Sequence, residues 1–169
     1  MAERLATLEK EFRQYPELPL FARLADCYLQ RGLAVKALEV CRAGCSRFPD
    51  YSPGHAVLSR CHEALEDLEA ARAALGRALR LDPDNPAGLK RLATLQEGLG
   101  DHEAARAALI QAGRLDPLDA QVAERLDRFA YTERLEAVGV RSQPYDELPR
   151  PHEVSAAARQ RARQLVVGL

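Results

Sequence analysis

Residues 52–85 read SPGHAVLSRCHEALEDLEAARAALGRALRLDPDN, and the next 34 residues, 86–119, read PAGLKRLATLQEGLGDHEAARAALIQAGRLDPLD. Shifting the whole sequence by 34 residues aligns identical residues in three columns without a gap. These columns hold Leu24, Leu58, Leu92 and Leu126; Ala37, Ala71 and Ala105; and Pro49, Pro83 and Pro117. The chain is therefore built from a repeated unit of 34 residues, and the earliest full copy spans 18–51.

Each unit has the apolar spacing of two successive helices. In the first unit, one helix face is predicted from residues three to four apart, namely Phe21, Leu24, Ala25 and Tyr28. The spacing restarts after Gly32, where the second helix contains Ala37, Cys41 and Gly44. Pro49 ends this helix because proline cannot continue the hydrogen-bond ladder. The unit is thus predicted to be a helical hairpin.

Local turn chemistry supports the hairpin prediction. Asp67 and Asp101 stand where they can cap the second helices, and Asn85 followed by Pro86 is a suitable start for the next first helix. A single helix of about 14 residues is marginal in water, so such hairpins gain their stability mainly by stacking on their neighbours.

The pattern resembles the tetratricopeptide repeat family, whose unit has a large, a small and an aromatic residue in its first helix, then small and large residues, then proline. The matching residues of the first unit are Phe21, Leu24, Ala25, Tyr28, Ala37, Cys41 and Pro49. Those of the second are His55, Leu58, Ser59, His62, Ala71, Leu75 and Pro83, and those of the third are Leu89, Leu92, Ala93, Gln96, Ala105, Leu109 and Pro117. The resemblance implies an all-α fold, a right-handed superhelical stack of antiparallel helix pairs.

The chain departs from the family pattern at a few positions. It has no Trp, and His62 and Gln96 replace the aromatic residue of the first helix. Glu66 stands where Gly32 and Gly100 close the turn in the other two units.

The predicted organisation has four parts. Residues 1–16 form an N-terminal covering helix, with Leu5, Leu8 and Phe12 on one face. The array spans 17–138. Its parts are the repeats 18–51, 52–85 and 86–119 and a capping helix at 120–138. A Pro-containing linker at 139–151 precedes an amphipathic helix at 152–169.

Three positions are open for the C-terminal helix: against its own array, against a second copy in a homodimer, or against a partner. The first two are favoured because an amphipathic stripe is more often buried structure than a recognition device. A resting place on a membrane surface is the weakest alternative because the stripe lacks aromatic anchors.

Composition narrows the class of partner and the compartment. The formal net charge of -1 provides no global field for nucleic acid, so none is expected as a partner. No signal peptide and no apolar run long enough for a membrane span is found, and the expected location is cytoplasmic. The four cysteines lack a disulfide-type pattern and are expected to be reduced thiols.

Members of the resembled family bind peptides or helices in a concave groove lined by their first helices. The resemblance therefore implies a groove made by equivalent positions of each unit. Those positions hold Ala22, Asp26, Leu29, Gln30, Ala56, Arg60, Glu63, Lys90, Thr94, Glu97, Glu124, Arg128 and Tyr131. This mixed surface suits a peptide carrying both charges. The alternative interpretation is that each charged residue only solvates a helix face.

One subtype of the family grips the C-terminal carboxylate of chaperones with Lys and Asn side chains. Here the corresponding positions hold Ala22 and Asp26 in the first repeat, Val57 in the second and Ala87 in the third, and only Arg91 is retained. The sequence does not predict a receptor for chaperone tails.

No arrangement of residues predicts catalysis, a cofactor or a metal site. The spacing of Cys41, Cys45 and Cys61 is not a zinc pattern, and these residues share columns with core leucines. His55 and His62 occupy core positions, and no phosphate loop, H-E-x-x-H or G-x-S-x-G sequence occurs.

The sequence thus favours a non-catalytic adaptor or scaffold that binds a peptide or helix of another protein. The alternative is a dedicated chaperone for a secreted or aggregation-prone client, because small bacterial secretion chaperones of this family have a similar length and layout. A metal-dependent enzyme using the thiols is a third and weaker hypothesis.

Overall fold

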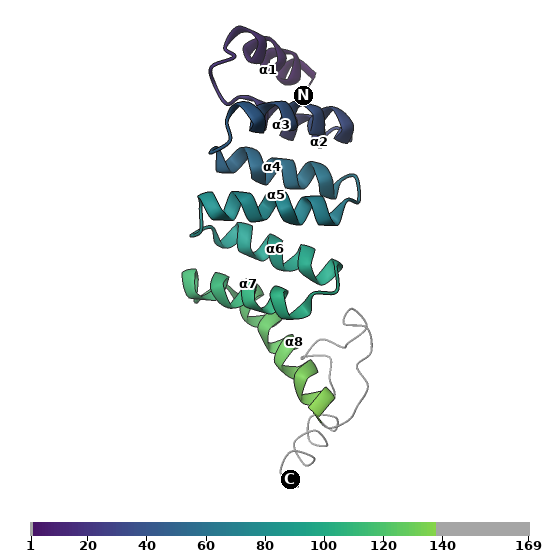
Figure 1. The fold of residues 1–169 in the computed structure, drawn as a ribbon, viewed down its shortest axis with the longest axis vertical. Helices are drawn as coiled ribbons and strands as arrows, with labels where there is room; N and C mark the ends of the chain where they lie inside the picture. The colour runs from purple at the N-terminus through teal and green to yellow at the C-terminus, as the bar shows by residue number, and fades with distance from the viewer. Residues whose placement is uncertain (1, 138–169) are drawn as a thin grey trace. The chain divides into compact units, whose positions relative to one another are not determined.

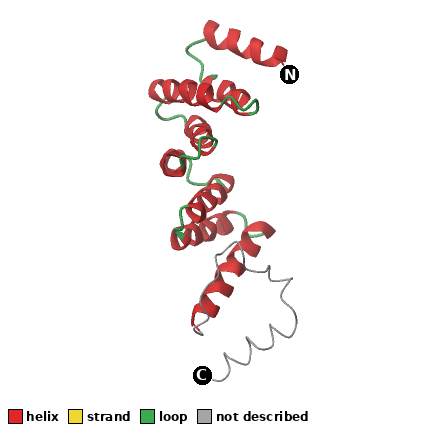
Figure 2. Ribbon diagram, turned by 90° about the vertical axis from the view of Figure 1, so that its right-hand side faces the viewer, coloured by secondary structure: helices red, strands yellow, loops and turns green. Residues whose placement is uncertain are grey.

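The computed structural model describes residues 2–137, and these form eight α-helices and no strand (Figure 2). The helices are α1 (Ala2–Gln14), α2 (Phe21–Leu29), α3 (Ala34–Arg47), α4 (Ser52–Glu63), α5 (Leu68–Leu81), α6 (Pro86–Gly98), α7 (His102–Leu115) and α8 (Ala120–Ala137). The chain divides into two compact units, residues 1–115 with α1 to α7 and residues 116–169 with α8. The predicted linker at 139–151 and helix at 152–169 lie outside the described residues.

Within the first unit, the helices pack in chain order as pairs (Figure 1). The pairs are α2 with α3, α4 with α5 and α6 with α7, and each pair packs on the next through α3 on α4 and α5 on α6. The first helices α2 and α4 also pack on each other. The all-α class and the stack of helix pairs predicted from the 34-residue period are confirmed.

The turn between the two helices has the same hydrogen bonds in each repeat. The residue that closes the turn has a positive φ in all three cases, with Gly32 at 72°, Glu66 at 61° and Gly100 at 77°. One N–H to C=O bond joins Leu33 to Tyr28, and its equivalents join Asp67 to His62 and Asp101 to Gln96, at 3.0, 3.0 and 2.8 Å. This is the Schellman arrangement that ends a helix at a left-handed residue.

The predicted N-caps are confirmed. The carboxylates of Asp67 and Asp101 accept hydrogen bonds from the backbone N–H groups of Ala70 and Ala104, both at 3.1 Å. The Asn85 side chain accepts from the Gly88 N–H at 2.9 Å, ahead of the proline that opens α6. Each of these bonds satisfies a donor that the helix itself leaves unpaired.

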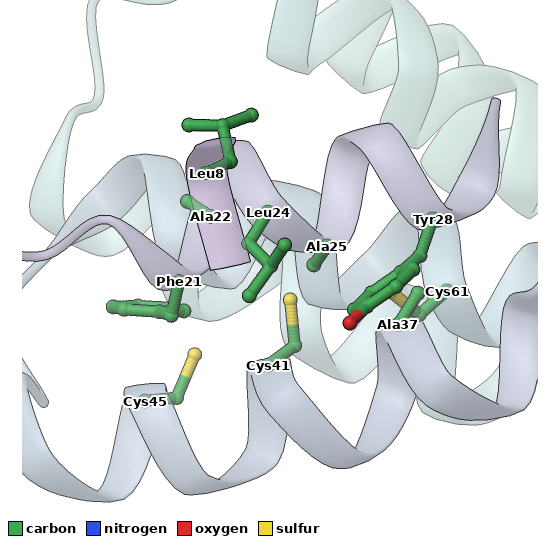
Figure 3. Close-up of a cluster of buried hydrophobic side chains, with 10 residues drawn as sticks. All are labelled: Leu8, Phe21, Ala22, Leu24, Ala25, Tyr28, Ala37, Cys41, Cys45 and Cys61. Carbon is green, nitrogen blue, oxygen red and sulfur yellow. The ribbon is translucent and has the colours of Figure 1, made fainter. Parts of the chain in front are cut away.

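Phe21 is the centre of the core in the first repeat. Its side chain is fully buried. The centroid of its ring lies 6.0 Å from that of the stacked Phe48 ring and 5.8 Å from that of the Tyr51 ring, which it meets edge-on. The two glycines that face its ring are Gly44 and Gly54. Figure 3 shows that the surrounding cluster is contributed by several helices, with Cys41 and Cys45 on the helix that packs against Phe21 and Leu24.

The helix α1 covers α2. Leu8 of α1 is 5% exposed and belongs to the same buried cluster as Phe21 and Leu24, and Leu5 and Phe12 pack against that cluster. The Tyr28 hydroxyl donates a 2.8 Å hydrogen bond to Glu9. Burial, followed by this bond to an acidic group, raises the pKa of Tyr28.

Across residues 2–137, no helix combines the length and apolar character that a membrane crossing requires.

Candidate partner-binding surface

An ion pair joins the first helices of the first and second repeats. Asp26 of α2 and Arg60 of α4 occupy equivalent positions, 34 residues apart, and the Arg60 Nη1 donates to the Asp26 Oδ1. Gln30, one turn further along α2, donates its side-chain amide to the other Asp26 oxygen at 3.0 Å. The Asp26 carboxylate is therefore held from both sides, by its own helix and by the next repeat.

A second ion pair joins the second and third repeats. Arg91 of α6 donates two hydrogen bonds to Glu63 of α4, from Nε at 2.7 Å and from Nη2 at 2.9 Å. The hydroxyl of the buried Ser59 donates to the same carboxylate at 3.2 Å. Two parallel bonds from one guanidinium fix its orientation as well as its position.

Together these side chains form what is called here the polar ladder, which runs over the first helices of three repeats. Its members are Asp26, Gln30, Ser59, Arg60, Glu63 and Arg91. The ladder brings together Asp26, Gln30, Arg60 and Glu63 of the predicted groove. Arg91 was not among the predicted groove residues, because its place in the repeat unit is not one of the groove positions that the family resemblance implies; its acidic partner Glu63 lies 28 residues earlier in the chain.

The remaining predicted residues differ in accessibility. Ala22 is only 5% exposed and lies in the cluster that contains Leu8, so α1 covers this position. Leu29 and Ala56 are half-buried, while Thr94 is exposed and donates its hydroxyl to the Lys90 carbonyl at 3.1 Å. The other candidates are Lys90 and Glu97 on α6, and Glu124, Arg128 and Tyr131 on α8 in the second unit.

The thiols are part of the core. Cys41 and Cys61 are fully buried and Cys45 is 8% exposed. The hydrogen bond between the Cys41 and Cys61 thiols, together with burial, raises the pKa of Cys41, and burial raises the pKa of Cys45 to about 11. The same hydrogen bond lowers the pKa of Cys61, whereas the raised pKa values of Cys41 and Cys45 make these two thiols poor nucleophiles and poor metal ligands. The described part of the chain holds no group of three or more His, Cys, Asp or Glu side chains suited to a metal ion.

His55 and His62 both contact groups at the ends of helices. The Nε2 of the buried His55 lies 2.8 Å from the Pro49 carbonyl oxygen, so this nitrogen donates to the end of the preceding repeat. The Nδ1 of His62 lies 3.4 Å from a carboxylate oxygen of Asp67, the residue that caps α5. These contacts give both histidines a structural role.

The geometry of α2 to α7 defines a class of protein, the helical-hairpin repeat arrays, in which each repeat packs on its neighbours along the chain. Residues 62–126 match the family model of the tetratricopeptide repeat. The family match covers these residues, and the fold of α2 to α7 is that of a tetratricopeptide repeat array.

Solved structures show the same fold. A crystal structure of MamA superposes with a TM-score of 0.68 at 18% identity, and covers 97% of this chain and 87% of MamA. The first repeat domain of Spaghetti (RPAP3), bound to the HSP90 peptide SRMEEVD, superposes with a TM-score of 0.61 at 14% identity. The match covers 66% of this chain and 89% of the RPAP3 chain. The Yersinia enterocolitica type III secretion chaperone SycD, in complex with a peptide of the translocator YopD, superposes with a TM-score of 0.57 at 21% identity. The match covers 73% of this chain and 92% of the SycD chain. Among curated proteins no sequence match was found.

Proposed function

We propose that the chain is a non-catalytic adaptor that binds a peptide or helix of another protein on the face formed by its first helices. The observation that carries this proposal is the polar ladder, which places half-exposed charged side chains from α2, α4 and α6 in one row. Such groups contribute little to stability at a protein surface, yet they give direction and register to a bound chain.

The similar structures support this kind of partner. The repeat domain of RPAP3 and the chaperone SycD were both solved with a peptide of another protein. Contacts of this size commonly give affinities near 1 μM, or about -8 kcal/mol, which suits a regulated assembly. The free thiols of the described residues fit a reducing compartment such as the cytoplasm.

The second candidate is a dedicated chaperone for a secreted or aggregation-prone client. The likeness to SycD favours it, because that chaperone is matched over 92% of its length. Co-expression separates the two functions: a chaperone raises the soluble yield of a client encoded nearby, whereas an adaptor leaves that yield unchanged.

Affinity capture from the native cell tests the adaptor proposal. Thr94→Trp places a bulky, uncharged side chain on the exposed part of α6 without disturbing the core, and we expect it to abolish capture of the principal partner by blocking this face. Arg80→Trp, on the exposed face of the second helix α5, is the matched control and should leave capture intact. Loss of capture with the control, but not with Thr94→Trp, would place the partner on the opposite face and reject the proposal.

A further inference from the structure

We propose that the partner segment docks on the polar ladder through acidic side chains, which accept hydrogen bonds from Arg60 and Arg91. This inference rests on the proposed function and names the chemistry of the segment that the first-helix face selects. It follows from the balance of hydrogen-bond donors and acceptors that the ladder leaves unused.

The carboxylates of the ladder are largely engaged within the chain. Asp26 accepts from Arg60 at one oxygen and from Gln30 at the other. Glu63 accepts two bonds from Arg91 and one from Ser59. Since a carboxylate offers about four lone-pair sites, Asp26 keeps two and Glu63 keeps one. A cationic side chain of a partner would find few acceptors here.

The guanidinium groups retain most of their donors. A guanidinium has five N–H groups; Arg60 uses one of them on Asp26, and Arg91 uses two on Glu63. Within residues 2–137, four N–H groups of Arg60 and three of Arg91 therefore have no hydrogen-bond partner and stay available for a bound ligand. The side chains are 36% and 42% exposed, so these donors can be reached from solvent. The ladder has no net charge, yet its unused hydrogen-bonding capacity is mainly that of a donor.

Both arginines are connected to α4, Arg60 as one of its residues and Arg91 through its bonds to Glu63. Arg60 and Glu63 lie three residues apart on α4, which puts them one turn apart on the same face. Arg60 binds Asp26 of α2, and Glu63 binds the Arg91 guanidinium, so the two ion pairs involve residues of α4 that are one turn apart. Planar guanidinium groups fit carboxylates in a paired geometry, and each charge-assisted bond is stronger than a neutral one. One acidic side chain, or two spaced by a turn, would satisfy this arrangement.

We assign the acid to side chains of the partner and not to its C-terminal carboxylate. A chain terminus presents its carboxylate at a single point, whereas Arg60 and Arg91 come from helices of successive repeats and line a row.

The test selects 12-residue random peptides, displayed on phage with their C-termini fused, on the immobilised full chain. We expect Asp and Glu to be enriched in the selected peptides. Synthetic copies of the best binders, measured by fluorescence anisotropy, should lose about tenfold or more in affinity when their acids are changed to Asn or Gln. The same loss is expected for unchanged peptides against the variant Arg60→Gln with Arg91→Gln, but not against Arg80→Gln.

Each other outcome has a definite meaning. Selected peptides that are basic or uncharged, or that bind the double variant as tightly as the parent, overturn the acidic-segment inference. If those peptides still lose binding to Thr94→Trp, the proposed function stands without it. Binding that requires a free C-terminal carboxylate in the synthetic copies rejects the assignment to side chains. If no peptide is selected at all, the proposed function fails and the inference fails with it. The peptide substitutions leave the protein untouched, so poor folding of the double variant does not decide the test.

Discussion

At the scale of single residues, the fit between Phe21 and Gly44 shows how one aromatic side chain sets the packing of the first repeat. A Cβ added at Gly44 would lie 2.1 Å from the Phe21 Cγ atom. We expect Gly44→Ala to lower the free energy of unfolding by about 1–3 kcal/mol, because the fully buried ring has no room to move. Urea denaturation followed by circular dichroism measures this change.

Gly76 provides the control for this substitution. It is a helical glycine of α5 at which an added Cβ would meet only the Arg80 side chain, at 3.8 Å. We expect Gly76→Ala to stabilise the protein by about 0.5–1 kcal/mol, because alanine favours a helix over glycine. Equal effects of the two substitutions would contradict the close contact with Phe21.

Glu66 adopts a backbone conformation that disfavours its side chain. Its φ of 61° corresponds to those of Gly32 and Gly100 in the neighbouring repeats. We expect Glu66→Gly to raise the free energy of unfolding by about 1 kcal/mol, because a non-glycine residue is strained there. Gly32→Ala should lower stability instead, and since nothing lies within 4 Å of its added Cβ, the loss would report backbone strain alone. A neutral or destabilising Glu66→Gly would show that the Glu66 side chain offsets that strain.

Stability should fall at alkaline pH through Cys45. The folded chain holds the pKa of this thiol at about 11, raised from the ordinary value of 9.0. Between these two values the unfolded chain loses the proton before the folded chain does, so the free energy of unfolding decreases as pH rises from about 9 to about 11. The slope approaches about 1.4 kcal/mol per pH unit for one proton. Denaturant unfolding of the parent and of Cys45→Ala across this range isolates the effect, and equal slopes would contradict it.

The site was only partly predictable at this scale. The repeat columns placed Asp26, Arg60 and Glu63 on first helices, because helical spacing alone decides which face a residue occupies. They did not give the partners of these groups. The pairing of Arg91 with Glu63 depends on how α4 and α6 lie against each other, and the burial of Ala22 depends on where α1 packs.

At the scale of elements, the helices follow from signals close in sequence. The caps at Asp67, Asn85 and Asp101 were visible because an N-cap residue and the N–H that it accepts from are only three residues apart. The turn at Glu66 was predicted from register alone, since nothing in its residue type favours a positive φ.

The covering helix α1 provides a prediction at the same scale. Leu8 is its one fully buried apolar side chain among the residues whose burial is described, so Leu8→Ala should lower stability by about 2 kcal/mol or more and loosen the contact of α1 with α2. Lys10→Ala, on the exposed side of α1, is the control and should change stability by less than about 0.5 kcal/mol. Hydrogen exchange of the α1 amides reports the loosening directly. Equal protection in the parent and in Leu8→Ala would mean that α1 is held by other contacts, such as that of Glu9 with Tyr28.

At the scale of the whole molecule, the fold was predictable because a repeat array needs only contacts between neighbours. In the first unit each helix packs mainly on the helix before and after it, so one correctly recognised repeat determines the arrangement of the next. The helix α8 belongs to the second unit and lies outside the three full repeats, so the packing between neighbours in the first unit does not determine its arrangement.

The central claim is that a partner protein binds along the first helices of the array. Hydrogen–deuterium exchange of the full chain, alone and with its captured partner, tests this claim most directly. We predict slower exchange of the backbone amides of α2, α4 and α6 when the partner is bound, most strongly around Arg60 and Glu63 on α4. Amide exchange at the exposed faces of α3, α5 and α7 should not change. Protection confined to α3, α5 and α7 would contradict the account.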